Sequence, residues 1–406
     1  MQMLKDSEIN GHHIYLTDNN YPILFPCLYA KWTVKHGLSI NQKSKKNKIT
    51  NVIEHYFEES EISEDAQGKR LTYLSHFLDW VDSDESPEQV NLDNHTALPA
   101  DYLNMYINEY IIETLGKGEK ASATEVIALK SYYNFLSYFF DNKYKKIAIY
   151  SKNREIARVN NKASLLVKYL LPATRELLYD NAPNLMQEII LRNGGELGCR
   201  SAENGGFLLN DYKANKKTRQ GLLSLFRELD SQPNKQVFRY YLSSLYTKYG
   251  RSRTLYIERD HLVKMKKYYE EDRPDSDSNH LFVNDGGVNK GRCISSRYAT
   301  DIYREISKKV RQLMQDNPHY YSHYQPVQEG SSYHHLRHSF GTDIFNEECQ
   351  KRGKNYESIT TESAVYIETA RRMGHKVDGK RAPQVTKTYI HSCGHREQLL
   401  RETVYG

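Results

Sequence analysis

Apolar side chains in the first part of the chain recur every three or four residues. Within residues 71–81 the repeating positions are Leu71, Leu74, Phe77, Leu78 and Val81. The same spacing returns in residues 102–111 and again in residues 126–140. It places apolar side chains on one face of a helix, and no strand-like alternation is visible between residues 49 and 150. We therefore predict a small all-helical bundle of about four helices in this part of the chain.

After residue 230 the sequence contains two stretches that are typical of β-strands. Residues 237–241 and 254–257 are short, rich in aromatic and β-branched side chains, and separated by a turn at residues 248–253. Two such stretches around a turn predict an antiparallel pair of strands. Helical spacing dominates the remainder. The predicted fold class is mainly α with a small antiparallel β-sheet, in which an all-α domain precedes a mixed α+β domain.

Breaks in the helical pattern divide the chain. A basic stretch at residues 143–146 and a polar run at residues 151–162 interrupt the apolar repeat. We place a domain boundary there, between about residues 150 and 168. The predicted organisation is an N-terminal segment of uncertain role (residues 1–48), a helical domain (residues 49–160) and a mixed domain (residues 170–406).

Composition restricts the class of protein without identifying its partner. The 406 residues are 38% hydrophobic and 27% charged, and the net charge of +6 is compatible with a polyanionic partner. No stretch approaches the roughly 20 apolar residues of a membrane helix, and the N-terminus lacks a secretory pattern, so we expect a cytoplasmic protein. The five cysteines are scattered without a CxxC pair. This predicts neither a disulfide framework nor a cysteine-bound zinc site.

Polar candidates for chemistry are concentrated near the C-terminus. His334 and Arg337 are three positions apart, so on a helix they share one face and can converge on a small anion. Cleavage of a phosphodiester requires a nucleophile, donors for the non-bridging oxygens and an acid for the leaving hydroxyl. Arginine suits the second task because its planar fork binds phosphate through two hydrogen bonds. No carboxylate cluster typical of metal-dependent nucleases accompanies the histidines.

Five segments, in order, resemble the motifs of the tyrosine recombinases, also called the lambda integrase family. Residues 197–203 (LGCRSAE) are similar to the first-arginine motif TGLRxxE, and residues 247–253 (TKYGRSR) to the turn GKGxKxR. Residues 334–338 (HHLRH) match HxLRH, residues 374–375 match a later GH pair, and residues 386–391 (TKTYIH) resemble TxxYxH. The resemblance covers the second domain and, more loosely, the helical domain. It indicates an integrase of the phage or mobile-element type.

The resemblance implies a role for each matching residue. Tyr389 would attack the scissile phosphate and form a 3′-phosphotyrosyl link. Arg200 and Arg337 would clamp the non-bridging oxygens, and Lys248 would protonate the leaving 5′-oxygen. The covalent link would store the energy of the broken bond for rejoining, so neither a metal nor another cofactor is implied.

Two histidines and one acid complete the implied site. His334 would assist proton transfer at the tyrosine, and His375 would donate to a non-bridging oxygen. Glu203 would brace the site without taking part in the chemistry. His335 and His338 are expected to have structural roles.

The resemblance also implies the partners. A core-DNA-binding domain at residues 49–160 and a catalytic domain at residues 170–406 would embrace double-stranded DNA, with salt-dependent phosphate contacts. The protein would act as a homotetramer on two paired DNA sites to integrate or excise a DNA element. Accessory DNA-bending factors could take part. No membrane partner is expected.

Competing residues exist for two of these roles. The rivals of Lys248 are Lys216, Lys217 and Arg251. The rival of Tyr389 is Tyr366, which precedes the GH pair on a predicted helix. Its helical spacing with Ala370 and Met373 favours a packing role, so Tyr389 remains the predicted nucleophile.

Departures from the family pattern leave some questions open. Residues 346–363 lengthen the gap between Arg337 and His375, and residues 377–384 lengthen the gap before Tyr389. The second insertion leaves open whether Tyr389 acts in its own protomer or in a neighbour. Other functions also remain, namely a type IB topoisomerase-like enzyme, a hairpin telomere resolvase or an inert DNA-binding regulator. A metal site at His334, His335 and His338 is disfavoured because adjacent helical residues point about 100° apart.

Overall fold

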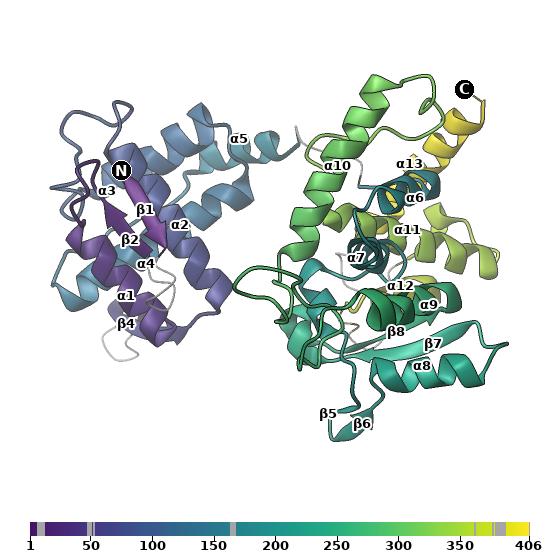
Figure 1. Ribbon diagram of the computed structural model, residues 1–406. Coiled ribbons are helices and arrows are strands. Elements are labelled where there is room, and N and C mark those ends of the chain that lie inside the picture. Colours follow the sequence, from purple (N-terminus) through teal and green to yellow (C-terminus); the bar gives the residue numbers. More distant parts are fainter. Residues whose placement is uncertain are drawn as a thin grey trace. The chain divides into compact units, whose positions relative to one another are not determined.

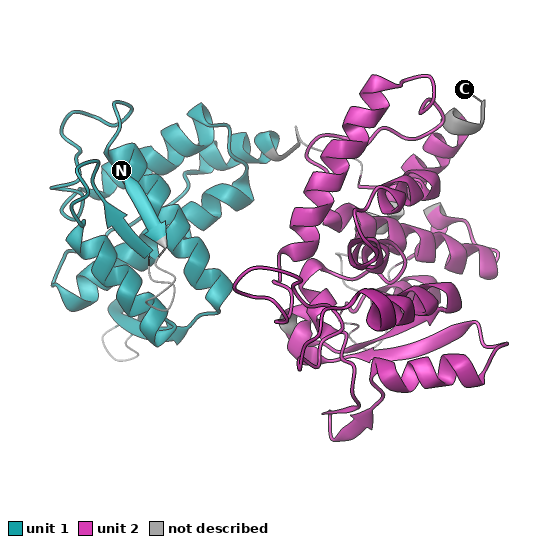
Figure 2. Ribbon diagram, in the orientation of Figure 1, with its two compact units in different colours: residues 1–165 teal, residues 166–406 magenta. Residues whose placement is uncertain are grey.

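The structure is a computed structural model, and it divides the chain into two compact units, residues 1–165 and 166–406 (Figure 2). The described backbone comprises residues 1–5, 13–46, 51, 53–162, 168–360, 363–375, 377 and 387–405. Side chains are not described at residues 5, 161–162, 249, 357, 387–391 and 402–405. No helix within these ranges is both long and apolar enough to cross a membrane.

The first unit combines helices with two antiparallel strand pairs (Figure 1). Its strands are β1 (Gln2–Lys5) with β2 (His13–Leu16), and β3 (Leu38–Lys46) with β4 (Ile53–Glu61). Its helices are α1 (Leu24–His36), α2 (Glu64–Val81), α3 (Ala100–Met105), the π-helical η1 (Tyr106–Thr114), α4 (Glu119–Phe139) and α5 (Ser151–Lys162). Residues 1–5 and 13–46 therefore lie in the same unit as the predicted helical bundle.

Helix α2 shows why the spacing of apolar residues predicted this unit. Leu71, Leu74, Phe77 and Leu78 are fully buried and form the face that packs against α4. The side chain of Ser63 accepts the backbone N–H of Ala66 at the start of the helix, which satisfies one of the free donors there. The predicted helix is confirmed.

Two elements of this unit differ from the sequence-based expectation. Strand β4 lies within the range that was predicted to be helical throughout, and its side chains are nearly all exposed. A strand without a buried face has no reason to alternate apolar and polar residues, so it left no signal. Helix α5 occupies the polar run that was predicted to interrupt the helices. It is held by the fully buried Ala157 and by polar contacts, among them a hydrogen bond from Asn153 to Asn108 and an ion pair of Arg158 with Glu119.

The second unit is mainly helical, with two small antiparallel hairpins (Figure 1). Its main helices are α6 (Pro172–Asp180), α7 (Leu185–Gly195), α8 (Leu222–Ser231), α9 (Arg259–Lys267), α10 (Tyr298–Asp316), α11 (Tyr333–Lys351), α12 (Ala364–Arg372) and α13 (Lys387–Tyr405). Short helical turns are η2 (Ser201–Gly206), η3 (Ser244–Tyr246), η4 (Lys248–Gly250), η5 (Tyr268–Asp272) and η6 (Tyr356–Ser358). The strands are β5 (Tyr212–Ala214) with β6 (Lys217–Arg219), and β7 (Val237–Leu242) with β8 (Arg253–Glu258).

The predicted strand pair is confirmed as β7 and β8. Its register places Val237 opposite Glu258 and Leu242 opposite Arg253. One face of β8 is buried, at Arg253, Leu255 and Ile257. Helix α9 packs against this hairpin. The predicted fold class, mainly α with small antiparallel sheets, is therefore also confirmed.

Helix α11 runs through the interior of the second unit and carries the histidine–arginine motif. The Tyr333 hydroxyl at its first residue donates to the Ile190 carbonyl at 2.9 Å and accepts from Asn204 at 3.1 Å. Gly194 of α7 leaves room for this ring, because a Cβ there would lie 2.9 Å from it. The imidazole of His335 accepts the backbone N–H of Ser332 and caps the helix. These contacts fix the residues that follow.

Candidate active site

A buried carboxylate, Glu203, lies at the centre of an arginine cluster. It is 1% exposed and accepts hydrogen bonds at 2.7 Å from both Arg200 and Arg253. The nearer Nη of Arg337 lies 3.7 Å from the same carboxylate. Burial alone would raise the pKa of Glu203, but the charges of Arg253, Arg337 and Arg200 outweigh it and lower the pKa to about 2. The carboxylate is therefore ionised at neutral pH and binds together arginines from three separate motifs.

The loop around Gly198 gives these arginines their second set of partners. Gly198 has φ of +61°, and a Cβ there would overlap the ring of Phe340. This conformation is accessible to glycine at little cost. The Gly198 carbonyl then accepts hydrogen bonds from Arg253 and from Arg337. One loop thus contributes a carbonyl acceptor, the braced arginine Arg200 and, through Glu203, the carboxylate.

Arg253 is a site residue to which the sequence motifs assigned no role. It is 6% exposed and, besides Glu203 and Gly198, donates to the carbonyls of Leu197 at 3.2 Å and Arg372 at 2.7 Å. It therefore joins β8 to the first-arginine loop and to the end of α12. A signal was present in the sequence. Arg253 lies two positions before the inward-facing Leu255, so both side chains point to the same face of the strand.

Arg337 is the largest fully buried side chain of the described protein. Its guanidinium donates to the carbonyls of Gly198 and Met373, the latter at 2.5 Å. Arg200, by contrast, is 25% exposed. The structure therefore brings both predicted clamp residues to Glu203 but leaves only Arg200 of the two accessible at the surface.

Two of the predicted catalytic histidines lie within the field of these arginines. His375 follows Gly374, whose φ is +67°, and its backbone N–H donates to Ala370 at 2.8 Å. Burial, followed by the charges of Arg337 and Arg200, lowers the pKa of His375 to about 3. The same causes lower the pKa of His334, on α11, to about 4. Both imidazoles are therefore neutral at pH 7, in surroundings that favour an anion.

His338 lies one turn after His334 on α11. The two rings are perpendicular, with centroids 4.6 Å apart. Burial and the neighbouring His334 lower the pKa of His338 to about 3. Among the residues that the structure describes, no group of three or more histidines, cysteines or carboxylates is placed to hold a metal ion.

Lys248 lies exposed in η4, in the connection between β7 and β8. Arg253, at the other end of that connection, is fixed to Glu203. The rivals Lys216 and Lys217 are exposed in the β5–β6 hairpin. The third rival, Arg251, lines a pocket together with His375. The assignment of the acid to Lys248 stays a prediction.

Tyr389 lies in the first turn of α13, and its side chain is outside the described residues. Its rival Tyr366 is fully buried, packs with Ala370 and makes an edge-to-face contact with Phe345 at 5.6 Å. The predicted packing role of Tyr366 is confirmed. Tyr389 therefore remains the predicted nucleophile.

Helix α13 packs against α11 of the same chain. Cys393, one turn after Tyr389, is 1% exposed and lies in an apolar cluster with Phe345. Arg396 then approaches Asp343 at 3.4 Å. Asp343 is also bound by Arg175 at 2.5 Å, so α13 is anchored to a fixed acid of α11.

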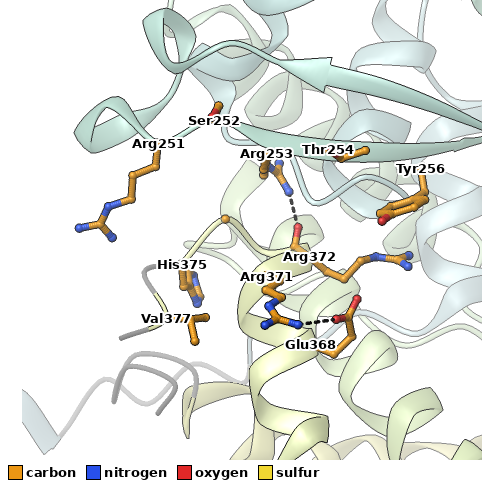
Figure 3. A pocket seen from close by; sticks show the side chains of 11 residues that line it. Arg251, Ser252, Arg253, Thr254, Tyr256, Glu368, Arg371, Arg372, His375 and Val377 are labelled. Carbon is orange, nitrogen blue, oxygen red and sulfur yellow. Dashed lines mark hydrogen bonds and ion pairs between the residues drawn. The ribbon is translucent and has the colours of Figure 1, made fainter. Parts of the chain in front are cut away.

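A cavity of about 560 Å³ opens beside the arginine cluster, and Arg253 is one of its lining residues (Figure 3). Strand β8 and the residues just before it form one wall, and α12 with the turn after it forms the other. Figure 3 shows Arg251 and His375 on one side of the pocket, and Tyr256 with Arg372 on the other. The buried Arg253 links the two walls through the carbonyl of Arg372.

No protein-family model matches the chain, and no curated protein matches it. Solved structures do resemble it. One is the integrase of the Tn1549 transposon in complex with circular intermediate DNA, with 14% identity, coverage of 93% of this chain and 99% of that one, and a TM-score of 0.42. Two lambda integrase dimers bound to a COC′ core site have 12% and 11% identity and TM-scores of 0.38 and 0.40. They cover 80% and 97% of this chain, and 95% of each of those chains.

All three are integrases, the class that the sequence motifs resemble. The chemistry of the site follows from the contacts of this chain's own side chains.

Proposed function

We propose that the protein is a tyrosine-type site-specific DNA recombinase, an integrase that cuts and rejoins DNA through a 3′-phosphotyrosyl intermediate. The supporting observation is the convergence on Glu203. Arg200, Arg253 and Arg337 come from three motifs far apart in the sequence, and all three approach this one buried carboxylate. The resulting field also lowers the pKa of His375. Such a fixed positive site suits a phosphodiester that gains negative charge as it reacts.

The reaction itself exchanges one phosphodiester for another. The hydroxyl oxygen of Tyr389 bonds to phosphorus while the bond from phosphorus to the 5′-oxygen breaks. The tyrosine proton passes to the neutral imidazole of His334, and Lys248 protonates the departing 5′-oxygen. Rejoining reverses each transfer, so no external energy source is consumed.

The arginines divide the work of stabilising the transition state. Arg200 is partly exposed and is held by Glu203, so its remaining donors can bind a non-bridging oxygen without reorganising. Arg337 is buried behind it and bonded to two carbonyls. Arg337 is fully buried, so the groups that cover it would have to move for it to clamp the phosphate directly. His375, two residues after Met373, would donate to the other non-bridging oxygen.

The proposed partner is double-stranded DNA, bound by the protein as a homotetramer on two paired sites in the cytoplasm. The outcome would be integration or excision of a DNA element, with accessory DNA-bending factors as further candidates. These proposals rest on the sequence motifs. The net charge of +6 is consistent with a phosphate-dominated interface.

Trapping the covalent intermediate tests the proposal. A nicked suicide substrate loses its 5′-hydroxyl fragment after cleavage, so a protein–DNA adduct accumulates and can be mapped by peptide mass spectrometry. We expect an adduct at Tyr389 that forms in EDTA and is lost in Tyr389→Phe. An adduct that survives Tyr389→Phe would overturn the assignment of the nucleophile. DNA binding without an adduct on any substrate would favour an inert regulator, and relaxation of supercoils without recombination would favour a topoisomerase.

A further inference from the structure

The pocket beside His375 has a strongly cationic lining to which the proposed cleavage chemistry assigns no role. Its walls include Arg251, Arg253, Arg371 and Arg372, and Glu368 is the one carboxylate among the lining residues that the structure describes. Arg253 is already bound to the buried Glu203. The other three arginines lie around the same cavity, and Glu368 pairs with one of them, Arg371. Cations held together in this way repel one another unless an anion lies between them.

The carboxylate of Glu368 forms only a weak ion pair. Arg371 approaches Glu368 at 3.8 Å, and the two side chains are 65% and 34% exposed. Exposed pairs at this distance contribute little, because solvent and salt screen them. Arg371 can therefore exchange Glu368 for a stronger anionic partner without a large loss.

The guanidinium of Arg372, at the end of α12, is preoriented by Tyr256 of β8. It lies over the ring of Tyr256, 4.6 Å from the ring centre. Stacking on an aromatic face fixes the plane of a guanidinium and leaves its edge donors available. The backbone carbonyl of the same residue is held by Arg253. The wall thus presents a donor whose position is set before any ligand arrives.

The position of the pocket indicates the source of its anion. His375 lines the pocket and is also the proposed donor to the phosphate that is cut. A polyanion bound at the cleavage site would therefore have a phosphate within reach of the pocket. We propose that Arg251, Arg371 and Arg372 form a second phosphate subsite, which binds a neighbouring phosphate of the same DNA strand. This inference rests on the proposed function for the identity of the strand, while its chemistry requires only a phosphate.

A charge-neutralising variant with a matched control tests the subsite. Arg371→Gln removes one pocket cation. Arg304→Gln is the control, because Arg304 lies on α10, is 69% exposed and pairs with Asp301 three residues earlier at 3.2 Å. Affinity for a random-sequence duplex is measured over a range of salt concentrations. We expect Arg371→Gln to weaken binding about tenfold and to reduce the slope of log K against log salt by about one. Arg304→Gln should change neither quantity.

A second measurement separates phosphate of the DNA strand from free phosphate compounds. Inorganic pyrophosphate is titrated into the protein by calorimetry, with and without the duplex. We expect weak binding that is lost in Arg371→Gln and abolished by the duplex. Pyrophosphate that binds tightly in the pocket and is not displaced by the duplex would overturn the assignment to the DNA strand.

The outcomes distinguish the two proposals. Equal effects of Arg371→Gln and Arg304→Gln on DNA affinity would overturn the subsite, even where the wild-type protein forms the Tyr389 adduct. Conversely, a selective loss in Arg371→Gln would support the subsite, even where no adduct forms on any substrate. In the latter case the proposed cleavage function fails and the phosphate-binding pocket remains.

Discussion

Arg253 and Glu203 form a buried ion pair at 2.7 Å, with 3% and 1% of their side chains exposed. The pair joins the first residue of β8 to the turn that carries Arg200. Arg253 also holds the carbonyl of Arg372, close to the turn that carries His375. Three segments of the candidate site thus depend on one carboxylate and one guanidinium.

Neutralising the carboxylate should therefore destabilise the second unit. Glu203→Gln would leave the buried guanidiniums of Arg253 and Arg337 without their counter-charge, and loss of one partner of a buried pair costs about 3 kcal/mol or more. We expect the midpoint of urea unfolding to fall accordingly. Glu305→Gln, on the exposed face of α10, should stay within about 0.5 kcal/mol of the wild type. Equal midpoints for the two variants would contradict a central role for Glu203.

Alanine substitutions at two glycines with the same positive φ distinguish the cost of backbone strain from the cost of steric overlap. Gly198 and Gly250 both have φ of +61°, but a Cβ would overlap Phe340 at Gly198 and meet nothing within 4 Å at Gly250. Gly250→Ala should cost about 1 kcal/mol from the left-handed conformation alone. Gly198→Ala should cost at least about 2 kcal/mol more, because Phe340 must also move. Calorimetric unfolding of both variants would measure the difference, and similar values would show that Phe340 yields easily.

Elements could be predicted from the sequence where burial of one face imposes a repeating pattern of apolar residues. Leu71 and Phe77 repeat at helical spacing because one face of α2 is buried. Strand β4 was not predicted. Its side chains are almost all exposed, so its sequence does not alternate between apolar and polar residues. The proposed site shows the same contrast. The motifs singled out Arg200 and Arg337, but their shared carboxylate contact and the burial of Arg337 depend on contacts between distant segments, which spacing cannot reveal.

Arg253 illustrates a signal that was present but overlooked. A charged residue in register with the inward-facing Leu255 must have a buried partner, since an unpaired buried charge is too costly. The partner, Glu203, is fifty residues away in sequence. The sequence can therefore indicate that such a pair exists, whereas the identity of the partner requires the fold.

The depressed pKa of His375 makes stability depend on pH. In the unfolded chain a histidine titrates near 6.5, whereas His375 in the folded protein titrates at about 3. Between these values the unfolded state binds more protons, so acidification from pH 7 lowers the free energy of unfolding. We expect this slope to become shallower in His375→Gln, by up to about 1.4 kcal/mol per pH unit.

Nuclear magnetic resonance titration of the His375 ring directly tests whether burial and the nearby arginines lower its pKa. Arg200 is one of the cations that lower the pKa of His375. Arg200→Gln should therefore raise the pKa, and a bound phosphate should raise it by the same reasoning. A ring that titrates near 6.5 in the wild-type protein would contradict the electrostatic picture of the site.

The packing of α13 predicts which protomer supplies the nucleophile. Cys393 is buried against α11 of its own chain, and Arg396 approaches Asp343 of that helix at 3.4 Å. Tyr389 lies one turn before Cys393 on the same helix, so transfer to a neighbouring protomer would require this packing to be undone. We therefore predict that Tyr389 acts within its own chain.

Mixing two inactive proteins distinguishes the modes of delivery. Tyr389→Phe lacks the nucleophile, and Arg200→Ala lacks a phosphate ligand but retains Tyr389. If the tyrosine acts in its own protomer, each active centre in the mixture lacks one of the two groups, and no adduct forms. Delivery to a neighbour would place an intact Tyr389 beside an intact Arg200 and restore adducts in the mixture. Arg396→Gln in an otherwise intact chain adds a graded check, since loosening α13 should slow adduct formation without preventing DNA binding.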